Sequence, residues 1–96
     1  MILNFRDRAS EDVYNGVNSR YARTIPRSIW KTAGRKLDML NAAKDLHDLQ
    51  AAPGNHLELL KESWAGHHSI RINNQYRIVF KWVAGNANDV VIVDYH

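Results

Sequence analysis

The sequence contains no cysteine, which excludes a disulfide framework, a thiolate metal site and a cysteine nucleophile. Long hydrophobic runs are also missing. The longest aliphatic run is 90–93, far below the roughly 20 residues that a membrane-spanning helix needs. At the N-terminus, a short apolar stretch is followed at once by the charge pair Arg6 and Asp7, which is not the pattern of a signal peptide. We therefore expect a soluble, cytoplasmic protein.

Glycine and proline are few, with 5 and 2 residues, and the glycines are scattered, so the chain has no glycine-rich phosphate loop. Hydrophobic residues make up 45% and charged residues 24% of the chain, which is typical of a globular protein. A length of 96 residues leaves room for one domain, which we expect to span residues 1–96.

The formal net charge is only +3, but the basic residues gather in one segment. Residues 20–36, here called the basic segment, contain no acidic residue and six basic ones: Arg20, Arg23, Arg27, Lys31, Arg35 and Lys36. Four of these recur at intervals of four. Such spacing of like charges destabilises a helix by about 0.2–0.5 kcal/mol per pair. A stripe of this kind more often faces solvent, but without interleaved acids it also suits a phosphate backbone.

The first half of the chain predicts helices. A short strand over 2–5 precedes a helix over 9–16, with Ser10 as its N-cap and Gly16 at its end. Residues 17–25 are expected to form a loop. Pro26 then opens a helix of about 18 residues, because its missing N–H is not needed at that position. One apolar stripe marks this helix: Trp30, Ala33, Leu37 and Leu40.

A short helical turn over 45–50 and a break at 53–55 follow, and from there the hydrophobic period becomes two. This period predicts strands over 56–60, 68–72, 76–82 and 89–95, with a turn at 85–88. Helices first and strands afterwards indicate an α+β protein with an antiparallel sheet.

The predicted hairpin has its loop at 73–75, which places Arg71 directly opposite Arg77. Both arginines then lie on the face opposite to the one that packs on the helices. Like charges facing each other across two strands destabilise a sheet by about 0.2–1 kcal/mol. The sequence leaves two readings open: an anion binds between the two guanidinium groups, or the side chains splay apart.

The histidines do not form a metal site. No two have the i, i+4 spacing of a helical zinc site, and the adjacent His67 and His68 point to opposite faces of a strand. The chain ends on three ionisable residues, Asp94, Tyr95 and His96. They could transfer protons at a phosphodiester or form an ordinary solvated end.

These features together resemble HigB, a toxin of bacterial toxin–antitoxin pairs in the RelE/ParE superfamily. The Pro53 to Glu58 stretch looks most like a GraT-type branch. The resemblance covers essentially the whole chain. It rests on the N-terminal Ile-x-x-Phe, the basic segment and these stretches: 37–43, 57–61, 66–73, 75–80 and 94–96.

The resemblance implies a RelE-like fold, with an antiparallel sheet of about four to five strands packed against two to three N-terminal helices. It also implies a metal-independent endoribonuclease without cofactors, which cuts messenger RNA on the ribosome and leaves a 2′,3′-cyclic phosphate. A HigA-type helix-turn-helix antitoxin would neutralise it, and contact with DNA would come only through that antitoxin.

By position, the resemblance assigns Arg77 to the scissile phosphate, Lys61 to added positive charge, and Asp94, Tyr95 and His96 to the acid–base end of the site. Arg71 and the basic segment residues Arg23, Arg27, Lys31 and Arg35 are the expected RNA-binding residues.

One position departs from the family. Many HigB sequences have a histidine where this chain has Glu58, so the general base is left open; a carboxylate with a raised pKa could serve. Two other functions remain open as well: a ParE-like toxin that binds DNA gyrase without catalysis, and a basic RNA-binding module.

Overall fold

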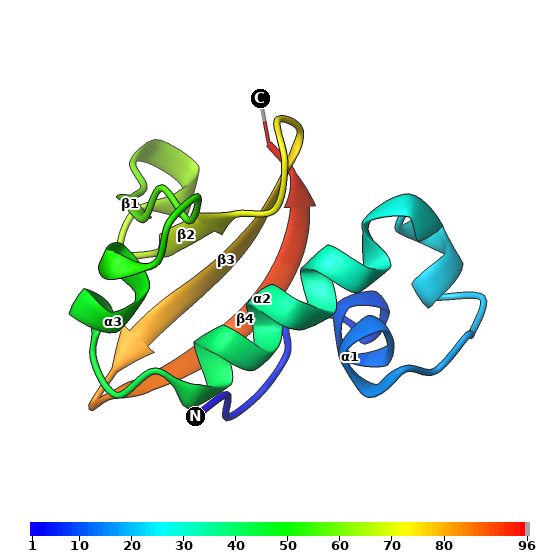
Figure 1. Ribbon diagram of the computed structural model, residues 1–96, viewed down its shortest axis with the longest axis horizontal. Coiled ribbons are helices and arrows are strands. Elements are labelled where there is room, and N and C mark those ends of the chain that lie inside the picture. Colours follow the sequence, from blue (N-terminus) through cyan, green and yellow to red (C-terminus); the bar gives the residue numbers. More distant parts are fainter. Residues whose placement is uncertain (96) are drawn as a thin grey trace.

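The computed structural model describes residues 1–95, which form an α+β fold as expected (Figure 1). The helices are α1 (Arg8–Asn15), α2 (Trp30–Ala42) and α3 (Leu46–Ala51), with 3-10 turns at Ala22–Thr24, Arg27–Ile29 and Glu62–Trp64. The strands are β1 (Glu58–Leu59), β2 (His68–Arg71), β3 (Tyr76–Val83) and β4 (Asn86–Asp94). They form one antiparallel sheet in the order β1-β2-β3-β4.

Helix α1 begins one residue earlier than predicted, and Ser10 is not its N-cap. The cap is Asp7, whose side chain accepts a hydrogen bond of 2.8 Å from the Ser10 amide. Ser10 is instead buried in the first turn, where its hydroxyl accepts a hydrogen bond of 2.8 Å from the Ile92 amide of β4. An aspartate caps as well as a serine does, so composition alone did not separate the two. Gly16 ends the helix with φ 72°, as expected.

Helix α2 is shorter than the expected 18 residues, because residues 27–29 after Pro26 form a 3-10 turn before the α-helix begins at Trp30. The predicted apolar stripe is confirmed, since Ala33, Leu37 and Leu40 are all fully buried. The short helix expected at 45–50 is α3.

The β2–β3 hairpin has the predicted loop and register, with Arg71 opposite Arg77. The Asn73 carboxamide oxygen accepts hydrogen bonds from the amides of Gln75 and Tyr76, at 2.8 and 2.7 Å. A side chain that bonds the backbone two residues on is the Asx-turn that makes asparagine favourable in loops.

The β3–β4 connection differs from the predicted turn at 85–88. The turn consists of Ala84 and Gly85, with φ 51° and 79°, so β4 begins three residues earlier than expected. A bulge at Asp89, with φ 51°, then shifts the register between the two strands. A two-residue turn of type I′ needs positive φ at both positions, and an alanine at the first of them does not predict such a turn.

Two predicted strands are much reduced. The expected strand at 56–60 contains only Glu58 and Leu59, because His56 has φ 45° and interrupts extended backbone. The expected strand at 2–5 is realised as two isolated parallel pairings, Ile2 with Ala87 and Phe5 with Val90. This segment covers the β4 edge that the N-terminal half of the strand would otherwise expose.

The two faces of the sheet are covered differently. Helices α1 and α2 lie over one face and enclose the main core with Ile70, Ile78 and Phe80 (Figure 1). On the other face, Leu60, Val79 and Val91 form a smaller cluster with Trp64, Val93 and Tyr95 packed on it. This second face, toward the end of the sheet where the chain ends, carries the candidate site. No helix in residues 1–95 is long and apolar enough to cross a membrane.

Candidate functional site

Arg77 is the centre of the site on the second face of the sheet. Its Nη1 donates hydrogen bonds to Ser69 Oγ at 2.7 Å and to the carbonyl of His56 at 3.2 Å. Its Nη2 lies 3.6 Å from the Glu58 carboxylate. The guanidinium carbon is 5.9 Å from the centre of the Tyr95 ring. Only 14% of the arginine side chain is exposed, so its orientation is fixed by these contacts.

Strand geometry explains why these groups meet. Glu58 is paired with Ser69 across β1 and β2, and Ser69 and Arg71 share a face because they are two residues apart. Arg77 lies opposite Arg71 and therefore on the same face. Glu58 is 51% exposed, so its ion pair with Arg77 is open to solvent and contributes little to stability.

Arg71 and Arg77 oppose each other, but the two guanidinium groups have different partners. Arg71 Nη2 donates to the Asn74 side chain, and the Arg71 amide donates to the Asn55 carbonyl at 2.7 Å. Each guanidinium group therefore has its own hydrogen-bond partners within the protein. The reading in which an anion binds between the two groups stays a prediction.

Asp94 and Tyr95, near the chain end, lie on different faces of the sheet. Tyr95 lies on the Arg77 side of the sheet, and its amide donates to the Gln75 carbonyl at 2.7 Å. Asp94 pairs with Tyr76, and its carboxylate accepts a hydrogen bond of 3.0 Å from the Gln75 amide group. His96 lies outside the described residues. The assignment of all three residues to the acid–base end of the site therefore stays a prediction.

Lys61 follows the buried Leu60 and directly precedes the 3-10 turn at Glu62–Trp64. Its side chain is exposed, and its carbonyl accepts a hydrogen bond of 3.2 Å from the Trp64 amide. The turn places Trp64 on the small cluster beside the site.

The basic segment runs from the loop before α2 into the helix. Arg23 donates hydrogen bonds of 3.1 Å to both the carbonyl and the side chain of Asn18. The Arg27 guanidinium lies 5.1 Å from the centre of the Trp30 ring. Lys31 and Arg35 are exposed on α2. The segment therefore presents five of its six charges on the surface, and the exception is Lys36, which is buried.

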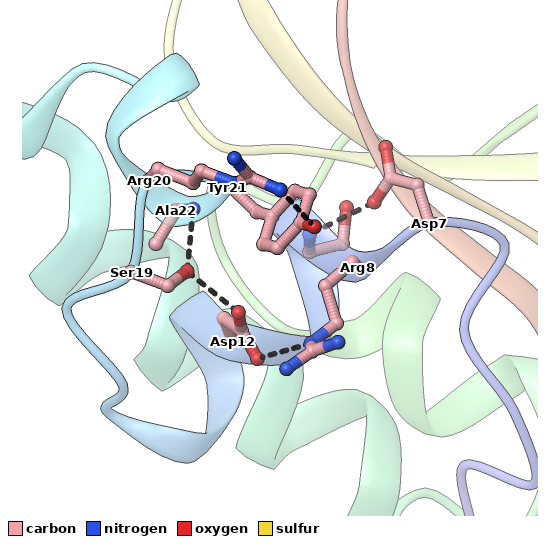
Figure 2. A network of polar contacts seen from close by, with 8 residues as sticks. Asp7, Arg8, Asp12, Ser19, Arg20, Tyr21 and Ala22 are labelled. Carbon is pink, nitrogen blue, oxygen red and sulfur yellow. Dashed lines mark hydrogen bonds and ion pairs between the residues drawn. The ribbon is translucent and has the colours of Figure 1, made fainter.

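A polar network holds the start of the basic segment against α1 (Figure 2). The buried Asp12 carboxylate accepts hydrogen bonds from Ser19 Oγ at 2.6 Å and from Arg8 Nε at 3.2 Å. Ser19 Oγ also accepts a hydrogen bond from the Ala22 amide at 3.0 Å. Tyr21 lies against two guanidinium groups, at 5.2 Å from Arg8 and 4.9 Å from Arg20.

Sequence reasoning missed three residues of this region: Lys36, Asn55 and Ser69. Lys36 is 4% exposed, and its Nζ donates a hydrogen bond of 2.6 Å to the Asn55 side chain. Burial lowers the pKa of Lys36, and the charges of Arg35 and Arg71 lower it further. The signal was present in the sequence, because Lys36 lies within the apolar stripe, three residues after Ala33.

Arg35 belongs to α2 and Arg71 to β2, and both lower the pKa of the same ammonium group. Within residues 1–95, no group of three histidine or acidic residues could hold a metal ion.

Curated proteins similar to this chain include Toxin HigB-1 of Vibrio cholerae serotype O1. It is 42% identical over 87 residues, which cover 91% of this chain and 90% of that protein. An uncharacterised protein of Haemophilus influenzae is 40% identical over 68 residues, which cover 71% of this chain and 67% of that protein.

Among solved structures, two YoeB–YefM complexes from Staphylococcus aureus match the whole chain with a TM-score of 0.60 at 18% identity. The match covers 98% of the chain in each complex, and at this identity it shows a shared fold. The RelE-like architecture expected from the sequence is therefore confirmed.

The family comparison agrees with both results. The family described as the RelE-like toxin of type II toxin–antitoxin system HigB matches residues 3–96. With that match and 42% identity to Toxin HigB-1 over most of its length, the chain belongs to the HigB-like toxins of type II toxin–antitoxin systems.

Proposed function

We propose that this HigB-like toxin is a metal-independent endoribonuclease that cuts messenger RNA. The observation that carries the proposal is the group of Arg77, Glu58 and Tyr95 on one face of the sheet. It combines a cation for the phosphate, a carboxylate and a phenol within a few ångströms. Membership in the HigB-like family supports the same activity.

Arg77 would bind the scissile phosphate. A guanidinium can donate two parallel hydrogen bonds to a phosphate and stabilise the charge that grows on it in the transition state. Its exposed ion pair with Glu58 is at 3.6 Å, so a phosphate can replace the carboxylate on Nη2. The Ser69 and His56 hydrogen bonds on Nη1 would meanwhile keep the guanidinium in place.

The reaction needs a base for the ribose 2′-hydroxyl and an acid for the leaving 5′-oxygen. Glu58 would accept the 2′-hydroxyl proton as the new bond to phosphorus forms. As the bond to the 5′-oxygen breaks, that oxygen would take a proton from Tyr95 or His96. An imidazole, with an ordinary pKa near 6.5, is the better donor at neutral pH. The product is a 2′,3′-cyclic phosphate.

Asp94 and Lys61 would assist without exchanging protons. Asp94 is hydrogen-bonded to Gln75 in the hairpin loop and so would hold the end of β4 against β3. Lys61 is exposed and three residues from Glu58, where it would add positive charge beside the phosphate.

The exposed residues of the basic segment would bind the RNA backbone on either side of the cleaved bond, together with Arg71. The absence of acidic residues among positions 20–36 supports this contact. Exposed Lys31 and Arg35 would contact phosphates of messenger RNA or of the ribosome, with Arg23 and Arg27.

An antitoxin protein is the second partner that we propose, of the HigA type expected from the sequence. Two solved structures that share this fold are complexes of the toxin–antitoxin pair YoeB–YefM. Any contact of the toxin with DNA would then be made through that antitoxin.

The proposal is tested with purified toxin, ribosomes and a defined messenger RNA. We expect Arg77→Ala to abolish both RNA cleavage and growth inhibition, while the circular dichroism spectrum is unchanged. The matched control is Lys81→Ala, which removes a cation of the same strand whose partner is Asp89, at 3.7 Å. Mass spectrometry of the cut RNA should find a 2′,3′-cyclic phosphate, and a 2′-deoxy substitution at the cut position should prevent cleavage.

The chain end is tested separately. Deletion of His96 should remove cleavage with an unchanged melting temperature, because a terminal residue contributes little to the core. Normal cleavage in both the deletion and Tyr95→Phe would remove the chain end from the site. If the unaltered toxin inhibits growth without cutting RNA, a ParE-like block of DNA gyrase becomes the better account.

A further inference from the structure

A buried lysine and a buried asparagine connect α2 to the segment that leads into β1. Lys36 is 4% exposed and Asn55 is 0% exposed. The hydrogen bond between Lys36 Nζ and Asn55 Oδ1 measures 2.6 Å. Buried lysine is rare unless it is paired, and here the described partner is a neutral amide rather than a carboxylate.

Asn55 contacts three elements of the fold, α2, α3 and β2. Its side-chain nitrogen donates to the Leu49 carbonyl of α3 at 3.0 Å and contacts Met39 Sδ of α2 at 3.1 Å. Its own carbonyl accepts from the Arg71 amide of β2 at 2.7 Å. With these contacts and the Lys36 hydrogen bond, the Asn55 side chain and carbonyl are fixed from several directions.

The residues directly after Asn55 hold Arg77. The His56 carbonyl accepts from Arg77 Nη1 at 3.2 Å, and the Glu58 carboxylate lies 3.6 Å from Nη2. His56 has φ 45°, a left-handed conformation that is unfavourable for a residue with a side chain. A backbone held in such a conformation depends on its surroundings, and Asn55 is the neighbouring residue that is anchored.

We propose that Lys36 and Asn55 are positioning residues, which set the orientation of Arg77 through the backbone of His56 and the placement of Glu58. The inference rests on the proposed ribonuclease function, because it concerns the same arginine. Lys36 lies on α2 and is separated from Arg77 by Asn55, so it acts through that residue and does not touch the RNA.

Stability alone does not explain a lysine at this position. Burial and the neighbouring cations Arg35 and Arg71 both disfavour its charged form. A buried charge without a charged partner generally destabilises a protein, and a hydrophobic residue of similar volume is often better tolerated. The geometry at Asn55 gives a reason for keeping a donor at the end of a long side chain.

The decisive variant is Lys36→Met, which keeps the length of the side chain and removes the donor. We expect the turnover number for RNA cleavage to fall about 10–100-fold, the range expected when a catalytic group is displaced by about 1 Å, with little change in KM. Lys36→Gln retains an N–H donor without the charge and should recover part of the activity. The control is Lys44→Met, an exposed lysine in the segment after α2.

A second measurement does not depend on catalysis. The NMR signal of the Arg77 Nε–H group, assigned by its loss in Arg77→Lys, should shift or broaden in Lys36→Met and stay unchanged in Lys44→Met. An unchanged Arg77 signal in a folded Lys36→Met protein would overturn the proposal. If the unaltered toxin cuts no RNA, the ribonuclease function fails, while the NMR comparison still decides the positioning role.

If Lys36→Met does not fold, Lys36→Gln replaces it in the NMR comparison. An Arg77 Nε–H signal that shifts or broadens only slightly in Lys36→Gln supports positioning through the hydrogen bond. A higher KM for RNA in the Lys36 variant, with an unchanged turnover number, would instead mean that Lys36 contributes only its charge to RNA binding. The proposal would then be wrong.

Discussion

A serine hydroxyl in the first turn of α1 satisfies a backbone donor of the edge strand β4. Ser10 Oγ accepts from the Ile92 amide at 2.8 Å, in a buried environment. Ser10→Ala would leave this amide without an acceptor, which costs about 1–3 kcal/mol. We expect the free energy of unfolding in urea to fall by that amount. Ser28→Ala, at an exposed position, is the control, and equal values for the two variants would contradict the assignment.

We expect His68 to make the stability of the protein depend on pH. Burial lowers the pKa of its imidazole, which stacks on Phe80 at 6.2 Å between ring centres. The unfolded chain therefore takes up a proton at a higher pH than the folded protein does. As the pH falls below about 6.5, the free energy of unfolding should decrease; above that value this group has no effect.

Thermal unfolding at several pH values tests this sign. The melting temperature of the unaltered protein should fall on going from neutral to mildly acidic buffer. The decrease should be smaller in His68→Gln and unchanged in His47→Gln, since His47 is exposed on α3. A melting temperature that rises on mild acidification would show that another group dominates.

At the scale of elements, regular patterns were predictable and local backbone exceptions were not. Strand alternation predicted the register of the β2–β3 hairpin because a single slip would move its apolar residues to the wrong face. It could not predict the bulge at Asp89 or the short β1, since both depend on positive φ at non-glycine residues. Such conformations are stabilised by contacts from distant segments, such as the Asn4 side chain on the Asp89 amide at 3.0 Å.

The exposed basic residues of α2 and of the 3-10 turn before it give the next prediction. Replacement of Arg27, Lys31 and Arg35 by glutamate should weaken binding to RNA or ribosomes. It should also flatten the dependence of affinity on salt, by about 0.7 in the logarithmic slope for each lost phosphate contact on single-stranded RNA. Binding measured by fluorescence anisotropy over a salt series gives this slope.

An unchanged salt slope in the triple variant would mean that these residues do not contact phosphates. A pull-down with the antitoxin separates the remaining possibility, that the same charges hold an acidic stretch of that protein. Lys44→Glu serves as the control for a charge reversal beside α2, because Lys44 is exposed just after the helix.

On the scale of the whole molecule, the two faces of the sheet carry different sets of residues. One face is closed by α1 and α2 around the main core, and the other carries the small cluster and Arg77. Arg77, Glu58 and the chain end could be proposed from the sequence, because the alternation of side chains along a strand and the family motifs can both be recognised in short stretches of sequence. Lys36 and Asn55 could not be placed, since their contact joins residues 19 positions apart on two elements whose packing the sequence does not specify.

This division predicts that stability and activity can be changed separately. Leu37 of α2 is 0% exposed and belongs to the main core, whereas Leu59 of β1 is 60% exposed. Leu37→Ala should lower the free energy of unfolding by about 2–5 kcal/mol, because it removes buried methyl groups and leaves a cavity. Leu59→Ala should change it by less than about 0.5 kcal/mol. Well below its melting temperature, Leu37→Ala should cut RNA about as well as the unaltered toxin does. Arg77→Ala should show the reverse pattern, with full stability and no cleavage. If Leu37→Ala lost cleavage while still fully folded, the packing of the main core would itself affect the site, and the prediction that stability and activity can be changed separately would be wrong.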